Sequence, residues 1–209
     1  TLSDTANRTI DEDTVFNGSV TVSDAETSAG SLLVTATASN PALIPNGNMK
    51  IDGTGATRTL TITPLPNQFG TATITVTVKD GDQGTATDTF ILTVNALNDR
   101  PTLEALPNIT LPAGAVPASL AVALTGIGSG AANEAETVTV TAVSRDAAVV
   151  SIPAQSIVVA ATAASLALAP NVNALDGAKA TVTVTVRDGG GVNGLFSRSF
   201  EFAVTGRLL

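Results

Sequence analysis

The side chains of this chain that could do chemistry are carboxylates and amides at the ends of alternating Thr and Val runs. The chain contains no Cys and no His, which excludes zinc and iron–sulfur centres, thiol nucleophiles and Ser-His-Asp triads. The remaining oxygen donors suit calcium, which takes about six to eight oxygen ligands. The candidate chemistry is therefore the binding of a hard cation, and not catalysis.

One segment of the sequence occurs twice. The run Thr73–Gly81 (TITVTVKDG) returns as Thr181–Gly189 (TVTVTVRDG), and Asp24–Glu26 (DAE) similarly matches Glu134–Glu136 (EAE). Both pairs are separated by more than a hundred residues of sequence. A repeat of roughly 100 residues has the size of a β-sandwich domain.

The repeat predicts two tandem domains, residues 1–97 and 98–209, joined by a hinge near 97–101. A copy of roughly 100 residues can bury its own core. Pro101 fixes its own φ and biases Arg100 toward an extended conformation. We therefore expect a stiff, extended hinge.

Alternation of apolar and polar residues between turn signals predicts strands and almost no helix. The fold class predicted is all-β, with two tandem antiparallel β-sandwiches of about seven strands each. Hydrophobic residues make up 44% of the chain and aromatic residues only 3%, a Val- and Thr-rich mixture that suits a pleated, half-buried surface. Ile74, Val76 and Val78 are expected to face the first core. The expected strands are residues 7–10, 15–22, 31–38, 48–52, 57–63, 71–79 and 85–94 in the first copy, and 107–111, 118–124, 137–143, 147–150, 155–160, 163–169, 179–187 and 195–204 in the second.

The charge balance limits the classes of partner. The net charge is −8, with four Lys and Arg against ten Asp and Glu in residues 1–97, and six against eight in residues 98–209. An acidic chain is poorly suited to nucleic acid or anionic membranes. The longest apolar stretch, Ser156–Ala169, is too short to span a bilayer. No signal peptide opens the sequence, so we expect a mature or internal fragment.

The oxygen donors nearest the hinge share one feature, which is that each lies at a strand end expected to face the junction. Successive antiparallel strands run in opposite directions, so residues before one strand and after another can meet at the same end. These residues are Glu12, Asn98 and Asp99 beside the first copy, and Glu134, Glu136 and Asp188 in the second.

Four motifs follow one another in a fixed order: Asp11–Thr14 (DEDT), Asp24–Glu26 (DAE), Val76–Gly81 (VTVKDG) and Asn98–Pro101 (NDRP). This order resembles the bacterial cadherin-like and Ig-like tandem repeats of large secreted or cell-surface proteins. The Cys pair, core Trp and tyrosine corner of immunoglobulin domains are missing. The resemblance therefore implies Ig-like sandwiches of the cadherin-like type.

The resemblance to cadherins implies an interdomain calcium site, because the matching positions in cadherins supply calcium ligands. Carried over, Glu12, Asn98, Asp99, Glu134, Glu136 and Asp188 would form the cage and calcium would lock the domains into a rod, with weak affinity of about 10⁻⁴ to 10⁻³ M. The sequence departs from the cadherin pattern, since Asn67-Gln68 replaces an acidic pair and EAE replaces Asp-x-Asp. The alternative is that these acids are solvated loop residues and turn formers.

A second acidic group is expected at the opposite end of the first copy. By the same logic it would face a preceding module and form an incomplete site by itself. Its members are Asp24, Glu26, Asp80 and Asp82.

Together these features predict a non-catalytic spacer or stalk module of a bacterial cell-surface or secreted adhesin-like protein, located outside the cell. Its expected partners are neighbouring repeat domains or identical subunits. One alternative is a subunit of an extracellular filament that assembles head to tail, because the two ends of the chain are chemically unlike. Another is a carbohydrate-binding accessory module, which is disfavoured because the chain has no Trp or Tyr for a sugar platform.

Overall fold

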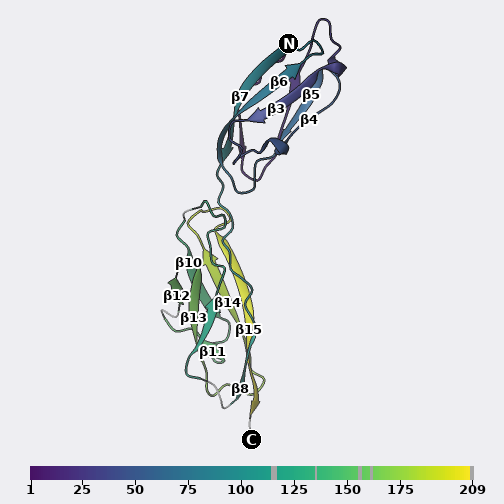
Figure 1. The fold of residues 1–209 in the computed structure, drawn as a ribbon. Helices are drawn as coiled ribbons and strands as arrows, with labels where there is room; N and C mark the ends of the chain where they lie inside the picture. The colour runs from purple at the N-terminus through teal and green to yellow at the C-terminus, as the bar shows by residue number, and fades with distance from the viewer. Residues whose placement is uncertain (114–116, 135, 155–156, 161, 208–209) are drawn as a thin grey trace. The chain divides into compact units, whose positions relative to one another are not determined.

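The computed structural model describes all residues except 114–116, 135, 155–156, 161 and 208–209. The chain divides into two compact units, Thr1–Leu97 and Asn98–Leu209, and both are built from β-strands (Figure 1). The all-β fold predicted from the sequence is confirmed. No helix in the described part of the chain is long and apolar enough to cross a membrane.

The first unit consists of two sheets. Its elements are β1 (Arg8–Asp11), β2 (Phe16–Thr21), η1 (Ala29–Ser31), β3 (Leu33–Ala38), η2 (Asn46–Asn48), β4 (Met49–Asp52), β5 (Thr57–Ile62), β6 (Gly70–Lys79) and β7 (Thr85–Asn95). One sheet has the order β1-β7-β6-β3 and the other β2-β5-β4. β1 runs parallel to β7, whereas the other pairs are antiparallel.

The second unit repeats this arrangement. Its strands are β8 (Ile109–Ala113), β9 (Leu120–Leu124), β10 (Thr139–Ser144), β11 (Val150–Ser151), β12 (Ile157–Ala160), β13 (Ala163–Pro170), β14 (Lys179–Arg187) and β15 (Leu195–Arg207). One sheet has the order β10-β14-β15-β8, with β8 parallel to β15. In the other, β13 pairs with β9, β11 and β12.

The alternating pattern selects the side chains that form each core. In β6, Ile74, Val76 and Val78 are buried, whereas Thr75 and Thr77 between them are half-buried and Thr73 before them is exposed. The same face of β14 is buried in the second unit. Burying such side chains stabilises each fold by about 25 cal/mol per Å² of apolar surface, so each unit has a core of its own.

The predicted strands agree with the structure to within about two residues in the first unit. The largest differences are of three residues in the second unit. The strand expected at 147–150 begins only at Val150 as β11, and β15 extends to Arg207, pairing in parallel with β8 across an irregularity between Thr205 and Arg207. Gly206 lies there with φ +72°, a conformation that Gly adopts without steric cost. The start of the strand expected at 155–160 lies outside the described residues.

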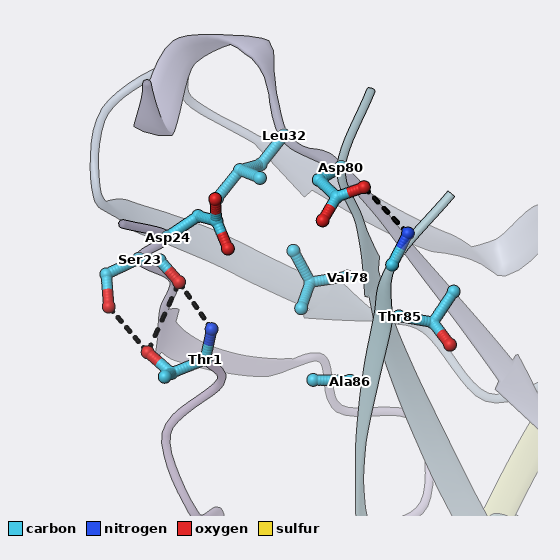
Figure 2. Close-up of a pocket in the computed structure, with 9 residues that line it drawn as sticks. Thr1, Ser23, Asp24, Leu32, Val78, Asp80, Thr85 and Ala86 are labelled. Carbon is cyan, nitrogen blue, oxygen red and sulfur yellow. Dashed lines mark hydrogen bonds between the residues drawn. The ribbon is translucent and has the colours of Figure 1, made fainter. Parts of the chain in front are cut away.

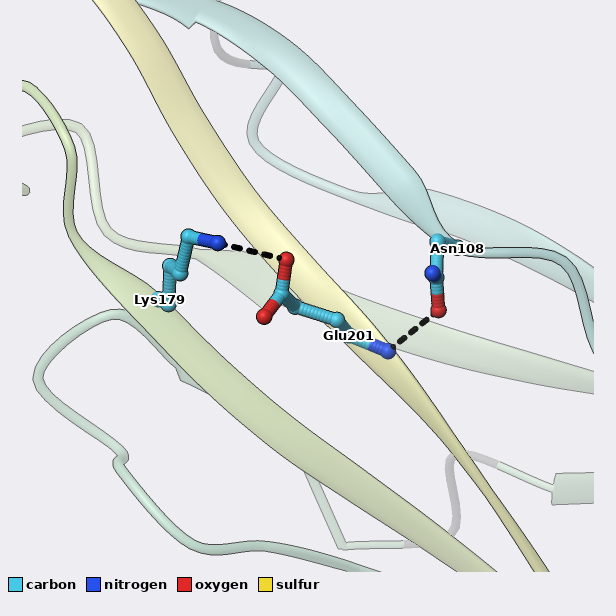
Figure 3. Close-up of polar contacts among 3 residues, drawn as sticks. All are labelled: Asn108, Lys179 and Glu201. Carbon is cyan, nitrogen blue, oxygen red and sulfur yellow. Dashed lines mark hydrogen bonds and ion pairs between the residues drawn. The ribbon is translucent and has the colours of Figure 1, made fainter.

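An asparagine in each unit aligns the parallel strand pair. Asn7 Oδ1 accepts the Ile91 N–H at 2.8 Å, and Asn108 Oδ1 accepts the Glu201 N–H at 2.8 Å. Figure 3 shows Asn108 on one side of Glu201 and Lys179 on the other, where Nζ lies 2.9 Å from Glu201 Oε1. Each asparagine stands just before the first strand of its unit, so it sets where that strand joins the last one.

Candidate metal site

The second unit gathers oxygen donors at the end where its chain begins. Asn98 Nδ2 donates to Asp188 Oδ1 at 3.2 Å and to the Val192 carbonyl at 2.9 Å. The Asp99 N–H donates to Glu134 Oε1 at 2.6 Å. We call this group, Asn98, Asp99, Glu134 and Asp188, the second-unit apex. Four of the six residues predicted for the calcium cage therefore lie in one connected group.

Among the described residues, some buried side-chain oxygens at this end have no hydrogen-bond partner. They include Asn98 Oδ1 and Asp188 Oδ2. Glu136 Oε2, on another residue predicted for the calcium cage, is a further such atom. Asp188 as a whole is only 5% exposed. A buried acceptor with no donor costs about 1–3 kcal/mol, and more when it is charged, so these atoms favour a cation that would accept their lone pairs.

Glycines allow the loops to approach the linker closely. A Cβ on Gly190 would lie 1.5 Å from Asn98 Oδ1, and one on Gly130 would lie 2.5 Å from the Asp99 Cβ. Gly130 also has φ +129°, which side chains with a Cβ rarely adopt. Sequence reasoning missed both glycines, although a Gly two positions after the Asp188 turn was a usable signal.

The linker is anchored to the second unit beyond the oxygen donors. The Arg100 guanidinium lies 4.6 Å from the centre of the Phe196 ring, and Arg198 lies 5.1 Å from it. Arg100 Nε donates to the Leu195 carbonyl at 3.2 Å, and Arg198 Nε to the Leu103 carbonyl at 2.7 Å. Stacked guanidinium groups of this kind are favourable. Of the residues expected to form the hinge, Asn98, Asp99 and Arg100 are thus fixed to the second unit, by contacts that the sequence did not indicate.

Glu12 belongs to the first unit. It is buried, its Oε1 accepts the Leu97 N–H at 2.6 Å, and its own N–H donates to the Asn95 carbonyl. The nearby Asp13 Oδ1 accepts the Asn67 N–H at 2.9 Å. These acids therefore close a loop of the first unit, and a share of Glu12 in calcium binding stays a prediction.

No group of three or more acidic side chains in the described part of the chain is arranged to hold a metal ion. In the second-unit apex, the Asp188 carboxylate accepts from the Asn98 side-chain amide, and the Glu134 carboxylate accepts from the backbone N–H groups of Asp99 and Ala131. Calcium binding by the predicted set consequently remains a proposal.

The matching end of the first unit holds a pocket of about 190 Å³ (Figure 2). Asp24 and Asp80 stand on opposite sides of it, and Val78 and Ala86 lie below them in this view. Of the second acidic group predicted from the sequence, these two line the pocket. The other two, Glu26 and Asp82, are exposed outside it.

Both pocket carboxylates accept hydrogen bonds from nearby backbone N–H groups. Asp24 Oδ1 accepts the N–H groups of Thr27 and Glu26, at 2.9 and 3.1 Å, and these bonds, Thr27 first, lower the pKa of Asp24 below its usual 3.8. Asp80 Oδ1 accepts the Gly84 N–H at 2.7 Å. Asp24 is therefore ionised at neutral pH, and in both residues Oδ1 accepts the backbone N–H groups.

Both units share a strand order in which the first and last strands pair in parallel. Residues 1–93 match the family model of the bacterial Ig domain. The resemblance to bacterial Ig-like repeats is thus confirmed for residues 1–93, and the second unit repeats the strand order of the first, with β12 added to one sheet. A search of curated proteins returns no match.

Solved structures with a similar fold include cadherin repeats. PcdhgB3 EC1-4 is 16% identical with a TM-score of 0.52, over 99% of this chain and 49% of that one. Extracellular cadherin domains 3-6 of protocadherin gamma B2 are 13% identical with a TM-score of 0.50, over 98% and 46%. Drosophila N-cadherin EC1-4 is 14% identical with a TM-score of 0.45, over 97% and 48%. The chain spans about half the length of each fragment, and the likeness concerns the fold.

Proposed function

We propose that this chain is a non-catalytic structural segment of a bacterial cell-surface or secreted adhesin-like protein, and that its second-unit apex binds calcium. The match of residues 1–93 to the bacterial Ig domain supports the structural role. An extracellular location and neighbouring repeat domains or identical subunits as partners are part of the same proposal.

The observation that carries calcium binding is the set of buried, unsatisfied oxygens at the second-unit apex. Asn98 Oδ1 and Asp188 Oδ2 belong to side chains already joined at 3.2 Å through their other polar atoms. Carboxylate and amide oxygens are the ligands that calcium takes. A cation held there would neutralise charge next to the linker residues and tie them more firmly to the second unit.

Calorimetric titration of the whole chain with calcium tests this proposal. We expect a dissociation constant of about 10⁻⁴ to 10⁻³ M, as in other extracellular modules. At calcium tenfold above that value, linkage stabilises the protein by about 1.4 kcal/mol. No heat of binding, together with an unchanged melting temperature between EDTA and millimolar calcium, would contradict it.

Two variants and a control locate the site. Asp188→Asn keeps the Oδ1 acceptor for the Gly190 N–H but removes the charge, so it should weaken calcium binding at least tenfold. Asp99→Ala should abolish the response, and Asp52→Ala, which lies at the end of β4 in the first unit, should leave it intact. Glu12→Gln decides whether the first unit contributes, because a loss would add Glu12 to the ligand set.

Head-to-tail filament assembly remains a second proposal, since the first-unit pocket offers carboxylates to an unlike surface. Electron microscopy at high protein concentration tests it, and uniform monomers with calcium would rule out autonomous assembly.

A carbohydrate-binding role has less support. Four of the six Phe are buried, Phe196 is half-buried between two arginines, and Phe69 is 44% exposed. One exposed ring makes a small sugar platform. A glycan array tests this role. Specific glycan binding that is lost in Phe69→Ala would favour the carbohydrate-binding role over the structural one.

A further inference from the structure

The side of the first-unit pocket that Ala86 lines holds an aromatic ring in the second unit. The register of the last hairpin shows this, because Val78 pairs with Ala86 in the first unit and Val186 with Phe196 in the second. The run shared by β6 and β14 fixes Val78 and Val186 as equivalent. A Phe ring therefore stands in the second unit where Ala86 lines an open pocket in the first.

Thr1 of the first unit and Thr102 of the second unit make equivalent backbone hydrogen bonds. The Thr1 N–H group donates to the Ser23 carbonyl, and the Thr102 N–H donates to the Gly128 carbonyl at 3.0 Å. Leu2 and Leu103 follow at the same step in both units. Two positions before Thr102 stands Arg100, so an equivalent residue would lie two positions before Thr1.

In the second unit, Arg100 covers the place that corresponds to the pocket. Its guanidinium lies over Phe196 and its Nε donates to the Leu195 carbonyl. Leu195 and Phe196 correspond to Thr85 and Ala86, and both of the latter line the first-unit pocket. The same structure thus shows an arginine seated against the matching wall of its own repeat.

The first-unit pocket differs from the region around Phe196 in the second unit, and the difference suits the binding of a cation. Where the second unit has the Phe196 ring, the first unit has a cavity of about 190 Å³ lined by Leu32, Val78 and Ala86. The carboxylates of Asp24 and Asp80 also line this cavity. Asp24 and Asp80 use Oδ1 for backbone N–H groups, and each carboxylate has a second oxygen that can accept from a cationic donor. A guanidinium has a planar apolar face and several donors, so it matches both the apolar floor and the carboxylates.

We propose that the first-unit pocket is a receptor for an arginine side chain carried on an extended segment of the Asn-Asp-Arg-Pro type that leads into Thr1. The segment is chemically the same as residues 98–101, and it would come from the linker of another repeat. The proposal goes beyond calcium binding and does not require it.

The test adds four residues in front of Thr1 of the whole chain. One version carries Asn-Asp-Arg-Pro and a matched version carries Asn-Asp-Ala-Pro, and both are measured in EDTA by hydrogen exchange. The arginine version should slow exchange in residues 20–33 and 78–88 about fivefold relative to the alanine version. Residues 181–187 of the second unit should be unchanged and serve as the internal control.

Charge-removing variants then identify the partner groups. Asp24→Asn and Asp80→Asn keep the oxygens that accept the backbone N–H groups but remove the charges, so the pair should abolish the difference between the two versions. Each single variant should reduce the difference in protection, and the single variants serve as the test if the double variant does not fold. Asp52→Asn should leave it intact, because Asp52 does not line the pocket.

Equal protection by the arginine and alanine versions would overturn the proposal, and so would protection that survives both Asn substitutions. Protection that appears only with calcium would identify a cation site completed by the added Asn-Asp, and would also overturn it. None of these outcomes depends on whether Asp188 binds calcium.

Discussion

The two apices occupy the same place in a repeated fold and differ in how they are closed. In the second unit, Asn98 and Asp99 are held by the loops, and Phe196 lies between two guanidinium groups. In the first unit, the matching place is a pocket with Ala86 at its floor and Asp24 and Asp80 at its sides. The comparison shows that the strands supply the scaffold, whereas the entering segment completes the apex.

The largest expected effect tests whether the two cores are separate. Val184→Asp should unfold the second unit and Val76→Asp the first, because an unpaired buried carboxylate costs on the order of 4 kcal/mol. Both valines are fully buried. Hydrogen exchange should show that only the mutated unit loses protection.

The exposed neighbours provide the controls for this experiment. Thr181→Asp and Thr73→Asp place the same charge on the opposite face of each strand, so they should leave both units folded. Loss of protection in both units after one core substitution would show that the cores are coupled.

An exchange of the residues at the apices should have opposite effects. Phe196→Ala should destabilise the second unit by about 2 kcal/mol, through a cavity and two lost guanidinium contacts. Ala86→Phe should stabilise the first unit by about 1 kcal/mol, because filling a cavity is favourable. Hydrogen exchange in urea resolves the two units.

Phe69→Ala is the matched control for the aromatic substitution, since this ring is exposed and its loss should change stability little. A loss at Phe196 no larger than at Phe69 would contradict the view that the ring closes the second-unit apex.

The two asparagines that align the parallel strands should be equivalent. Asn7→Ala and Asn108→Ala each remove an acceptor at 2.8 Å from a strand N–H, with an expected loss of about 1 kcal/mol in each unit. Urea unfolding measures both. Asn17→Ala, whose Oδ1 accepts only an exposed hydroxyl at 3.2 Å, should cost less, and an unequal loss at the first two would show that the repeats align their strands differently.

The smallest effect is expected in acid and concerns only the first unit. The backbone bonds of Thr27 and Glu26 lower the pKa of Asp24 below 3.8 in the folded state. The stability that Asp24 contributes is therefore present above its unfolded pKa and is lost as the pH falls through the lower, folded pKa. Urea midpoints at about pH 6 and about pH 3 should differ less in Asp24→Asn than in the unmodified chain, and an equal difference would contradict the assignment.

The sequence by itself determined the strands, the cores and the repeat. Alternation is a local property, so the burial of Ile74, Val76 and Val78 followed from their spacing. The shared run in β6 and β14 was also sufficient to predict the repeated fold, because equal patterns build equal sheets.

Only the tertiary structure decided how the loops and the linker meet. The sequence aligned Asp80 with Asp188, but Asp80 lines the first-unit pocket beside Ala86, whereas Asp188 is 5% exposed and accepts a hydrogen bond from Asn98. The contacts that make this difference join residues about ninety positions apart, such as Asn98 with Asp188 and Arg100 with Leu195. Such contacts depend on how whole strands bring their ends together and on glycines that allow the close approach, and neither has a local pattern in the sequence.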